Sequence, residues 1–248
     1  MSGAALDSLD YFKALHEAFG QILGKWEQQS TLLDAMLHLS WHSFEHNANA
    51  QCEGLPAIDC GKGCATCCTL RVTATAPEVL MVARFIQALH PALKARGIDL
   101  PAQVAAADAQ TQGLDEPGRV AARKRCPFIA QGACVIYQVR PLACRGLASH
   151  DRHACAQAAS GKVDEIPYSE PHMRVRSLVQ NAMQSAMRDA KLAWGNYELN
   201  QALTMALKDP SLLPRWLAGE DVFAPAQVHE VNPEEMAQTF DLLKAAAH

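Results

Sequence analysis

The sequence predicts a mostly α-helical protein with two irregular, cysteine-rich loop segments. Three observations support this fold class. Apolar residues recur at helical spacing, as in Phe12, Leu15 and Phe19, whereas the alternation typical of strands is almost absent. Glycines and prolines interrupt the helical patterns at residues 51–75 and 126–164. All nine cysteines fall in these two segments.

The helices follow from periodicity and from residues typical of helix ends. The first two, at 5–26 and 31–48, should pack as an antiparallel hairpin. The third has Pro77 at its first position and ends before Pro91, because proline suits a helix start and disrupts an interior. The last begins at Asn232. The predicted helices span residues 5–26, 31–48, 77–90, 101–111, 173–194, 197–207, 210–217 and 232 onward, with a short turn at 118–124 and an extended piece at 134–137.

Length and composition bound the protein class. The chain has 248 residues, of which 49% are apolar and 19% charged, which is enough to bury a core and excludes disorder, collagen and coiled coil. We expect one compact unit with a helical hairpin at 1–50, a cysteine-cluster core at 51–165 and a helical region at 166–248. A formal charge of −4 argues against a nucleic-acid partner.

The sequence shows no signal for a membrane or for a nucleotide. No apolar run approaches the roughly 20 residues of a membrane span, and the start lacks the basic and apolar regions of a signal peptide. We therefore predict a soluble, cytoplasmic protein without a membrane partner. No phosphate-binding or S-adenosylmethionine loop is present, and neither are the motifs of serine hydrolases or zinc proteases.

The first cysteine group is compact. Cys60, Cys64, Cys67 and Cys68 form the pattern C-x3-C-x2-CC, with four thiols in nine residues. Two residues between cysteines let both sulfurs converge on one metal across a tight turn, and the glycines between them free the backbone to turn. This spacing indicates a shared metal.

The second group is more widely spaced. It contains Cys126, Cys134 and Cys144, and Cys155 follows eleven residues later. The two groups meet if the helices at 77–90 and 101–111 form a hairpin between them. We therefore expect both loop segments to converge on one metal centre.

Several interpretations of the thiols remain open. Disulfides are less favoured, since the chain is expected to be cytosolic and the adjacent Cys67 and Cys68 cannot easily bridge each other. Inert buried cysteines would not crowd so closely, although Cys52 fits a simple packed thiol. Thiolates suit both zinc and iron–sulfur centres. The vicinal pair favours a multinuclear or two-site arrangement, because neighbouring side chains point apart.

Cations and histidines near the cysteines are either functional or simply hydrated. A tetrathiolate site is anionic, and Arg140 and Arg145 bracket Cys144, so both are candidates to balance its charge. His150 and His153 are candidates for ligation or proton transfer. Two further clusters are expected to be hydrated surface. One is the row His38, His42 and His46 on one helix face, for which a metal site is the alternative. The other contains the basic residues Arg119, Arg123, Lys124 and Arg125.

The combined motif resembles a known family. Residues 60–146 contain, in order, C-x3-C-x2-CC, CPF, C-x-IY and RP-x-x-CR. This pattern resembles the YkgJ-type cysteine-cluster family of zinc- or iron-chelating domains. An iron–sulfur flagellin lysine methylase has a similar signature. The resemblance implies that the ligands are Cys60, Cys64, Cys67, Cys68, Cys126, Cys134 and Cys144, and that Tyr137, Arg140, Pro141 and Arg145 surround them. Cys155 lies outside the pattern and is added from the sequence alone.

Three functions follow. The favoured one is a metal-binding protein that holds an iron–sulfur cluster or iron for redox, sensing or delivery. The second is a zinc-stabilised interaction module whose helices bind a protein partner. The third is a metal-dependent enzyme of group transfer or redox type, with an open coordination position beside His150 or His153.

Overall fold

The structure is a computed structural model that describes residues 8–26, 31–61, 63–160, 162–163, 165–230 and 232–246. Within this part, the chain forms eleven α-helices and only four two-residue strands, so the mostly α prediction is confirmed. The α-helices are α1 (Ser8–Trp26), α2 (Leu32–Gln51), α3 (Ala76–Lys94), α4 (Leu100–Thr111), α5 (Glu116–Ala122), α6 (Leu142–Gly146), α7 (Arg152–Ala159), α8 (Glu170–Asp189), α9 (Leu199–Lys208), α10 (Leu212–Leu217) and α11 (Pro233–Ala245). The strands are β1 (Thr73–Ala74), β2 (Ile129–Ala130), β3 (Ala133–Cys134) and β4 (Tyr197–Glu198), and the 3-10 turns are η1 (Tyr137–Val139) and η2 (Ala224–Ala226).

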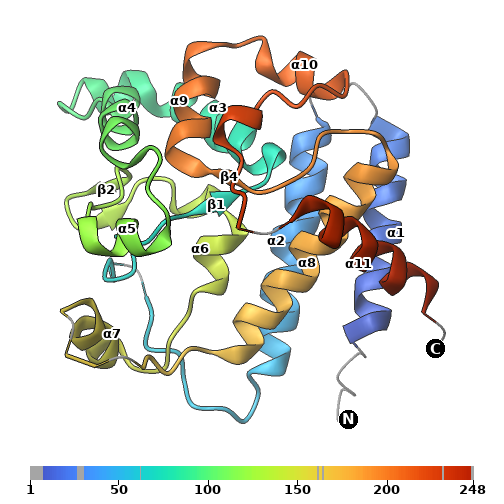
Figure 1. Ribbon diagram of the computed structural model, residues 1–248. Helices are drawn as coiled ribbons and strands as arrows, with labels where there is room; N and C mark the ends of the chain where they lie inside the picture. The colour runs from blue at the N-terminus through green and yellow to red at the C-terminus, as the bar shows by residue number, and fades with distance from the viewer. Residues whose placement is uncertain are drawn as a thin grey trace.

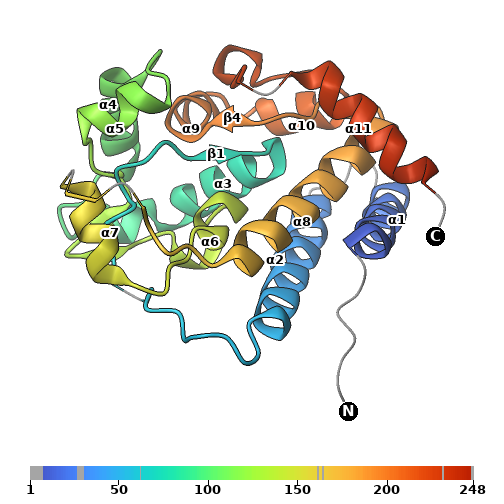
Figure 2. The same cartoon turned by 60° about the horizontal axis from the view of Figure 1, so that its bottom comes forward.

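The helices form two packed groups. In the first, α8 lies along α1 and α2, and α11 crosses α1 and α8 (Figures 1 and 2). In the second, α9 packs against α3 and α4. The groups meet where α2 contacts α3. The short helix α6 also packs against α8 of the first group. The first cysteine segment leaves α2 at one end of the molecule and passes α7 before it reaches β1 (Figure 1).

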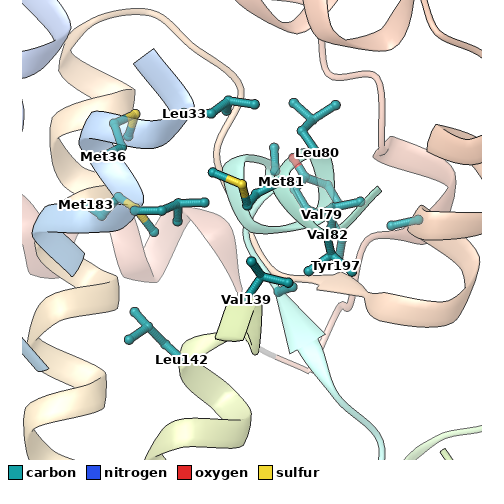
Figure 3. Packing of buried hydrophobic residues seen from close by; sticks show 14 of the residues in the cluster. Leu33, Met36, Val79, Leu80, Met81, Val82, Val139, Leu142, Met183 and Tyr197 are labelled. Atoms are coloured by element: carbon teal, nitrogen blue, oxygen red, sulfur yellow. The ribbon is translucent and has the colours of Figure 1, made fainter. Parts of the chain in front are cut away.

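The core lies where these groups meet. Met36 from α2, Met81 from α3 and Met183 from α8 are buried together with Leu142 from α6 (Figure 3). Burying apolar area of this kind provides the main stabilisation of a domain. Since α6 contributes Leu142 to the core, the helix that carries Cys144 is fixed to the rest of the molecule.

Several predicted helix ends differ from the structure, and the two largest errors are at the C-terminal ends of α3 and α8. Helix α3 continues through Pro91 to Lys94. Pro91 lies in the last turn, where the missing N–H removes a single hydrogen bond, and the added turn packs Leu93 against the core. Helix α8 ends at Asp189, because Lys191 takes the left-handed conformation (φ 61°) that was expected of Gly195.

The segment 126–164, predicted to be irregular, contains the helices α6 and α7. Asp151 caps α7 by accepting hydrogen bonds from the N–H groups of His153 and Ala154 at 2.7 and 2.9 Å. Of the predicted extended piece at 134–137, only Cys134 is in a strand, and Tyr137 begins η1. Helices of five and eight residues are too short to show a 3.6-residue period in sequence.

No helix among the described residues has the length and apolar character needed to cross a membrane.

Candidate metal centre

Seven of the nine cysteines line one cavity of about 470 Å³. They come from both cysteine segments, and they are Cys60, Cys64, Cys67, Cys68, Cys126, Cys134 and Cys144. Helix α2 adds Phe44 to the wall, and α8 adds His172 and Arg176. The candidate residues Tyr137, Arg140 and Arg145 line the same cavity. These are the seven cysteines that the family resemblance implied.

Hydrogen bonds join the two cysteine segments directly. The backbone N–H of Cys126 donates to the carbonyl of Cys68 at 2.6 Å. At the other end, the N–H of Asp59 donates to the carbonyl of Ser149 at 3.0 Å, and the N–H of Ser149 donates to Sγ of Cys60 at 3.3 Å. Helices α3 and α4, which lie between the segments in sequence, pack against each other. Two stretches remote in sequence therefore share one wall.

Consecutive turns shape the first cysteine group. The N–H of Cys64 donates to the carbonyl of Gly61 at 3.0 Å, and that of Cys68 donates to Ala65 at 3.1 Å. Gly63, in the first of these turns, has φ 93°, which only glycine adopts readily. Turns of this kind let sulfurs from nearby positions face one cavity.

Two local structures hold the second group. The hairpin β2–β3 places Cys134 opposite Ile129, and its two turn residues, Gln131 and Gly132, both have positive φ, as a tight hairpin turn requires. Cys144 lies on α6, which approaches α8 closely at Gly146. A Cβ added at Gly146 would lie 2.6 Å from Cβ of Arg176, so only glycine fits there.

Five of the cavity thiols have raised pKa values, which favour the neutral form when no metal is bound. Burial raises the pKa of Cys126 to about 11, and burial also raises the pKa values of Cys144, Cys134 and Cys60. A hydrogen bond with Cys68 and burial raise the pKa of Cys67. Because a metal binds the thiolate, loading this site must release protons.

Arg140 is the cation that acts on three of these thiols, while Arg119 lowers the pKa of Cys126. Its charge opposes the effect of burial by lowering the pKa values of Cys67, Cys134 and Cys144. Its guanidinium carbon lies 3.7 Å from the ring centre of Tyr137, and its Nε donates to the Tyr137 carbonyl at 3.2 Å. Tyr137 therefore orients Arg140 at the cavity.

Arg145 braces the second segment. Its guanidinium stacks on the ring of Trp41 at 4.8 Å and pairs with Glu45. It also donates to the carbonyls of Gln138 at 2.6 Å and Arg140 at 2.9 Å. These bonds tie the RP-x-x-CR stretch to α2.

The lining of the cavity combines the seven thiols with a cation whose donor is unused. Within the described ranges, no three His, Cys, Asp or Glu side chains are grouped closely enough to hold one metal ion. The same cavity contains Arg176, whose buried Nε has no hydrogen-bond partner among the described residues. A half-buried guanidinium with an unused buried N–H suits an anionic guest.

The remaining sequence candidates lie outside the cavity lining. Cys155 lies on α7, and its charge is one of the smaller influences on the pKa of Cys60. Cys52 contacts Ser169 and His172 at 3.7 and 3.6 Å, in line with a packed thiol.

The two histidines suggested by sequence are also elsewhere. Nδ1 of His150 lies 3.3 Å from the Ala57 carbonyl, and Nε2 of His153 lies 2.9 Å from the Gln157 amide nitrogen.

Sequence reasoning missed two residues that line this cavity, His172 and Arg176, and one that contacts its lining, Arg119. His172 and Arg176 come from α8, far beyond the cysteine motifs, and no local pattern marks them. Arg119 was predicted to be hydrated but is only 4% exposed, and it donates to the carbonyl of Leu70 at 3.4 Å. The basic stretch 119–125 contributes this buried brace because Arg119 points inward from α5.

A second cavity, of about 540 Å³, lies between α1, the end of α8 and α10. It contains no cysteine, and its polar residues include His16 and Asp189, whose side chains pair at 3.3 Å. The chemistry of the donors therefore favours the cysteine cavity as the functional site.

Comparison with known proteins supports metal chelation by the cysteine segment. No curated protein and no solved structure matches the chain significantly. For the cysteine segment the resemblance expected from the motif is confirmed, since residues 59–163 match the model of the CxxCxxCC family, described as "Putative zinc- or iron-chelating domain".

Proposed function

We propose that the cysteine cavity holds an iron–sulfur cluster, or iron, for redox, sensing or delivery. The observation that carries this proposal is the meeting of seven cysteines from two remote segments at one cavity. Cysteine thiolates are the usual ligands of iron–sulfur clusters. A bound cluster supplies one-electron redox chemistry, which the side chains cannot provide.

Donor spacing favours a cluster over any single ion, whether zinc or iron. A structural zinc site needs four ligands at about 2.0–2.3 Å from one ion, which makes a closed and compact group. The described His, Cys, Asp and Glu side chains do not form such a group, and the cysteines instead surround a cavity of about 470 Å³. In a cluster, different thiolates bind different iron atoms, so their sulfurs stand farther apart.

The charges around the cavity support an anionic guest. Arg140 acts on three of the thiols, and Arg176 has a buried, unused donor. Such groups offset the cost of burying a thiolate-bound centre and tune its reduction potential. His150 and His153 line no part of the cavity, so the geometry gives no support to an enzyme that uses them.

The test is elemental analysis with a visible spectrum on full-length protein purified without oxygen. A coloured protein that contains iron and acid-labile sulfide supports a cluster, whereas iron without sulfide supports iron alone. A colourless protein with stoichiometric zinc would contradict the proposal and favour the zinc-stabilised module.

Cysteine variants identify the ligands. Cys126→Ala and Cys144→Ala should lose metal, because both thiols line the cavity. Cys52→Ala is the matched control, since this thiol lies outside the lining and should leave the metal content unchanged. Cys155→Ala decides whether the eighth predicted ligand takes part. Retention of full metal by the Cys126 and Cys144 variants would refute the assigned cavity.

A further inference from the structure

Three histidines form a row on the outer face of α2. His38, His42 and His46 are all exposed, and α2 is one continuous helix from Leu32 to Gln51. Their spacing of four residues places each above the previous one on the helix surface. None of them lines the cysteine cavity. The row is therefore a feature separate from the proposed cluster site.

The three rings lie side by side. The ring centres of His38 and His42 are 6.0 Å apart with an interplanar angle of 7°, and those of His42 and His46 are 6.2 Å apart at 15°. Within the part of the chain that the structure describes, no hydrogen bond or ion pair engages these imidazoles. Their nitrogens are available, and the histidine χ2 torsion is broad, so neighbouring rings can turn toward one ion.

The nearby carboxylates are already engaged. Asp34 pairs with Arg84, and Glu45 pairs with Arg145. The row therefore offers nitrogen donors alone, which suit Zn²⁺, Ni²⁺ and Cu²⁺ rather than the oxygen-preferring Mg²⁺ and Ca²⁺. Two histidines four residues apart on a helix are a known metal-binding arrangement.

The geometry limits each ion to two of the three rings. His38 and His46 are eight residues apart, which is about 12 Å along a helix. This distance agrees with the lack of any three-ligand group among the described residues. His42 is thus common to both chelating pairs.

We propose that α2 carries a surface site for an imidazole-preferring divalent metal, formed by His42 with either His38 or His46. The pairs overlap at His42, so they bind one ion at a time. The site requires no cysteine and is independent of the proposed cluster.

The test is calorimetric titration of Ni²⁺ into untagged, full-length protein and its alanine variants. His42→Ala removes both pairs and should weaken the histidine-dependent binding by on the order of 10²-fold, which is the gain that linkage of two donors provides. The double variant His38→Ala/His46→Ala should lose as much. Each single end variant keeps one pair, and its binding should weaken only about twofold.

The controls separate this site from other nickel binding. His153→Ala removes an exposed histidine on α7 and should leave the titration unchanged, while any binding by the cysteines is common to all variants. Circular dichroism checks that helicity is kept, as expected because alanine has the highest helix propensity. Wild-type nickel affinity in His42→Ala or in the double variant would overturn the proposal.

Discussion

The buried carboxylate of Glu78 joins the starts of two helices that frame the cysteine cavity. Glu78 is 1% exposed. Its Oε1 accepts from the N–H of Leu142 at 2.7 Å, two residues before Cys144. Its Oε2 accepts from the N–H and the hydroxyl of Thr75 at 2.8 and 2.9 Å. Removing this side chain should loosen α6 from α3.

The expected loss follows from these three donors. In Glu78→Ala, all three are left buried without their acceptor, at about 1–3 kcal/mol each, although water that enters the space will satisfy some of them. We expect the free energy of unfolding to fall by about 3–5 kcal/mol, a large part of the stability of a typical domain. Glu78→Gln keeps one acceptor oxygen, so it should lose less, about 1–2 kcal/mol.

Urea unfolding followed by circular dichroism measures these losses, with an unchanged m-value as the test of comparable unfolding. The control is Glu170→Ala, at an exposed first-turn position of α8, which should stay within about 0.5 kcal/mol of wild type. A Glu78→Ala variant as stable as this control would refute the role of Glu78.

The pH dependence gives a second check on Glu78. Burial raises its pKa above 4.5, against the opposing effect of the Leu142 and Thr75 donors. A group with a raised folded pKa stabilises most below its unfolded pKa, and this contribution is lost as pH rises through the folded value. The stability of wild type relative to Glu78→Gln should therefore decline as pH rises from 4.5.

Three further predictions concern packing and charge. Gly146→Ala should lose about 1–3 kcal/mol in urea unfolding, because its Cβ would overlap Arg176 and force α6 away from α8. Arg140→Ala should raise the pKa of Cys134, because the Arg140 charge lowers it. Iodoacetamide should then label this thiol more slowly at mildly alkaline pH in metal-free protein. Arg140→Lys keeps the positive charge and should keep the labelling rate. The pKa of Asp241 is lowered to about 2 by its arginine partner in α8. The stabilisation from Asp241 is therefore fully present above pH 3.8 and is lost as pH falls through about 2. The acid unfolding of Asp241→Asn should lack this loss of stability.

Sequence predicted long helices well and their ends less well. The apolar periods that define α1, α2 and α8 persist over five turns, so these helices can be recognised without knowledge of their distant contacts. Ends depend on competing local terms, as the passage of α3 through Pro91 shows. There, the packing of Leu93 outweighs one lost hydrogen bond.

The meeting of the cysteines at one cavity could be predicted, because sulfur ligation constrains the spacing of cysteines along the chain. The rest of the cavity could not, since it depends on tertiary packing. His172 and Arg176 reach the site only because α8 packs against α6, and the close approach at Gly146 that allows this has no sequence signature. The inward orientation of Arg119 depends likewise on the Leu70 carbonyl, in another segment.

The walls of the cavity extend beyond the segment that matches the family. Residues 59–163 contain all seven lining cysteines, but Phe44 precedes this segment, and His172 and Arg176 follow it. The Arg145 brace also ends on Trp41 and Glu45 of α2. The isolated segment would therefore expose its thiols and lose the Arg176 guanidinium, whereas the full chain holds them in a partly desolvated site. Because loading converts neutral thiols to thiolates beside these cations, the flanking helices should favour retention of a bound group as well as the fold.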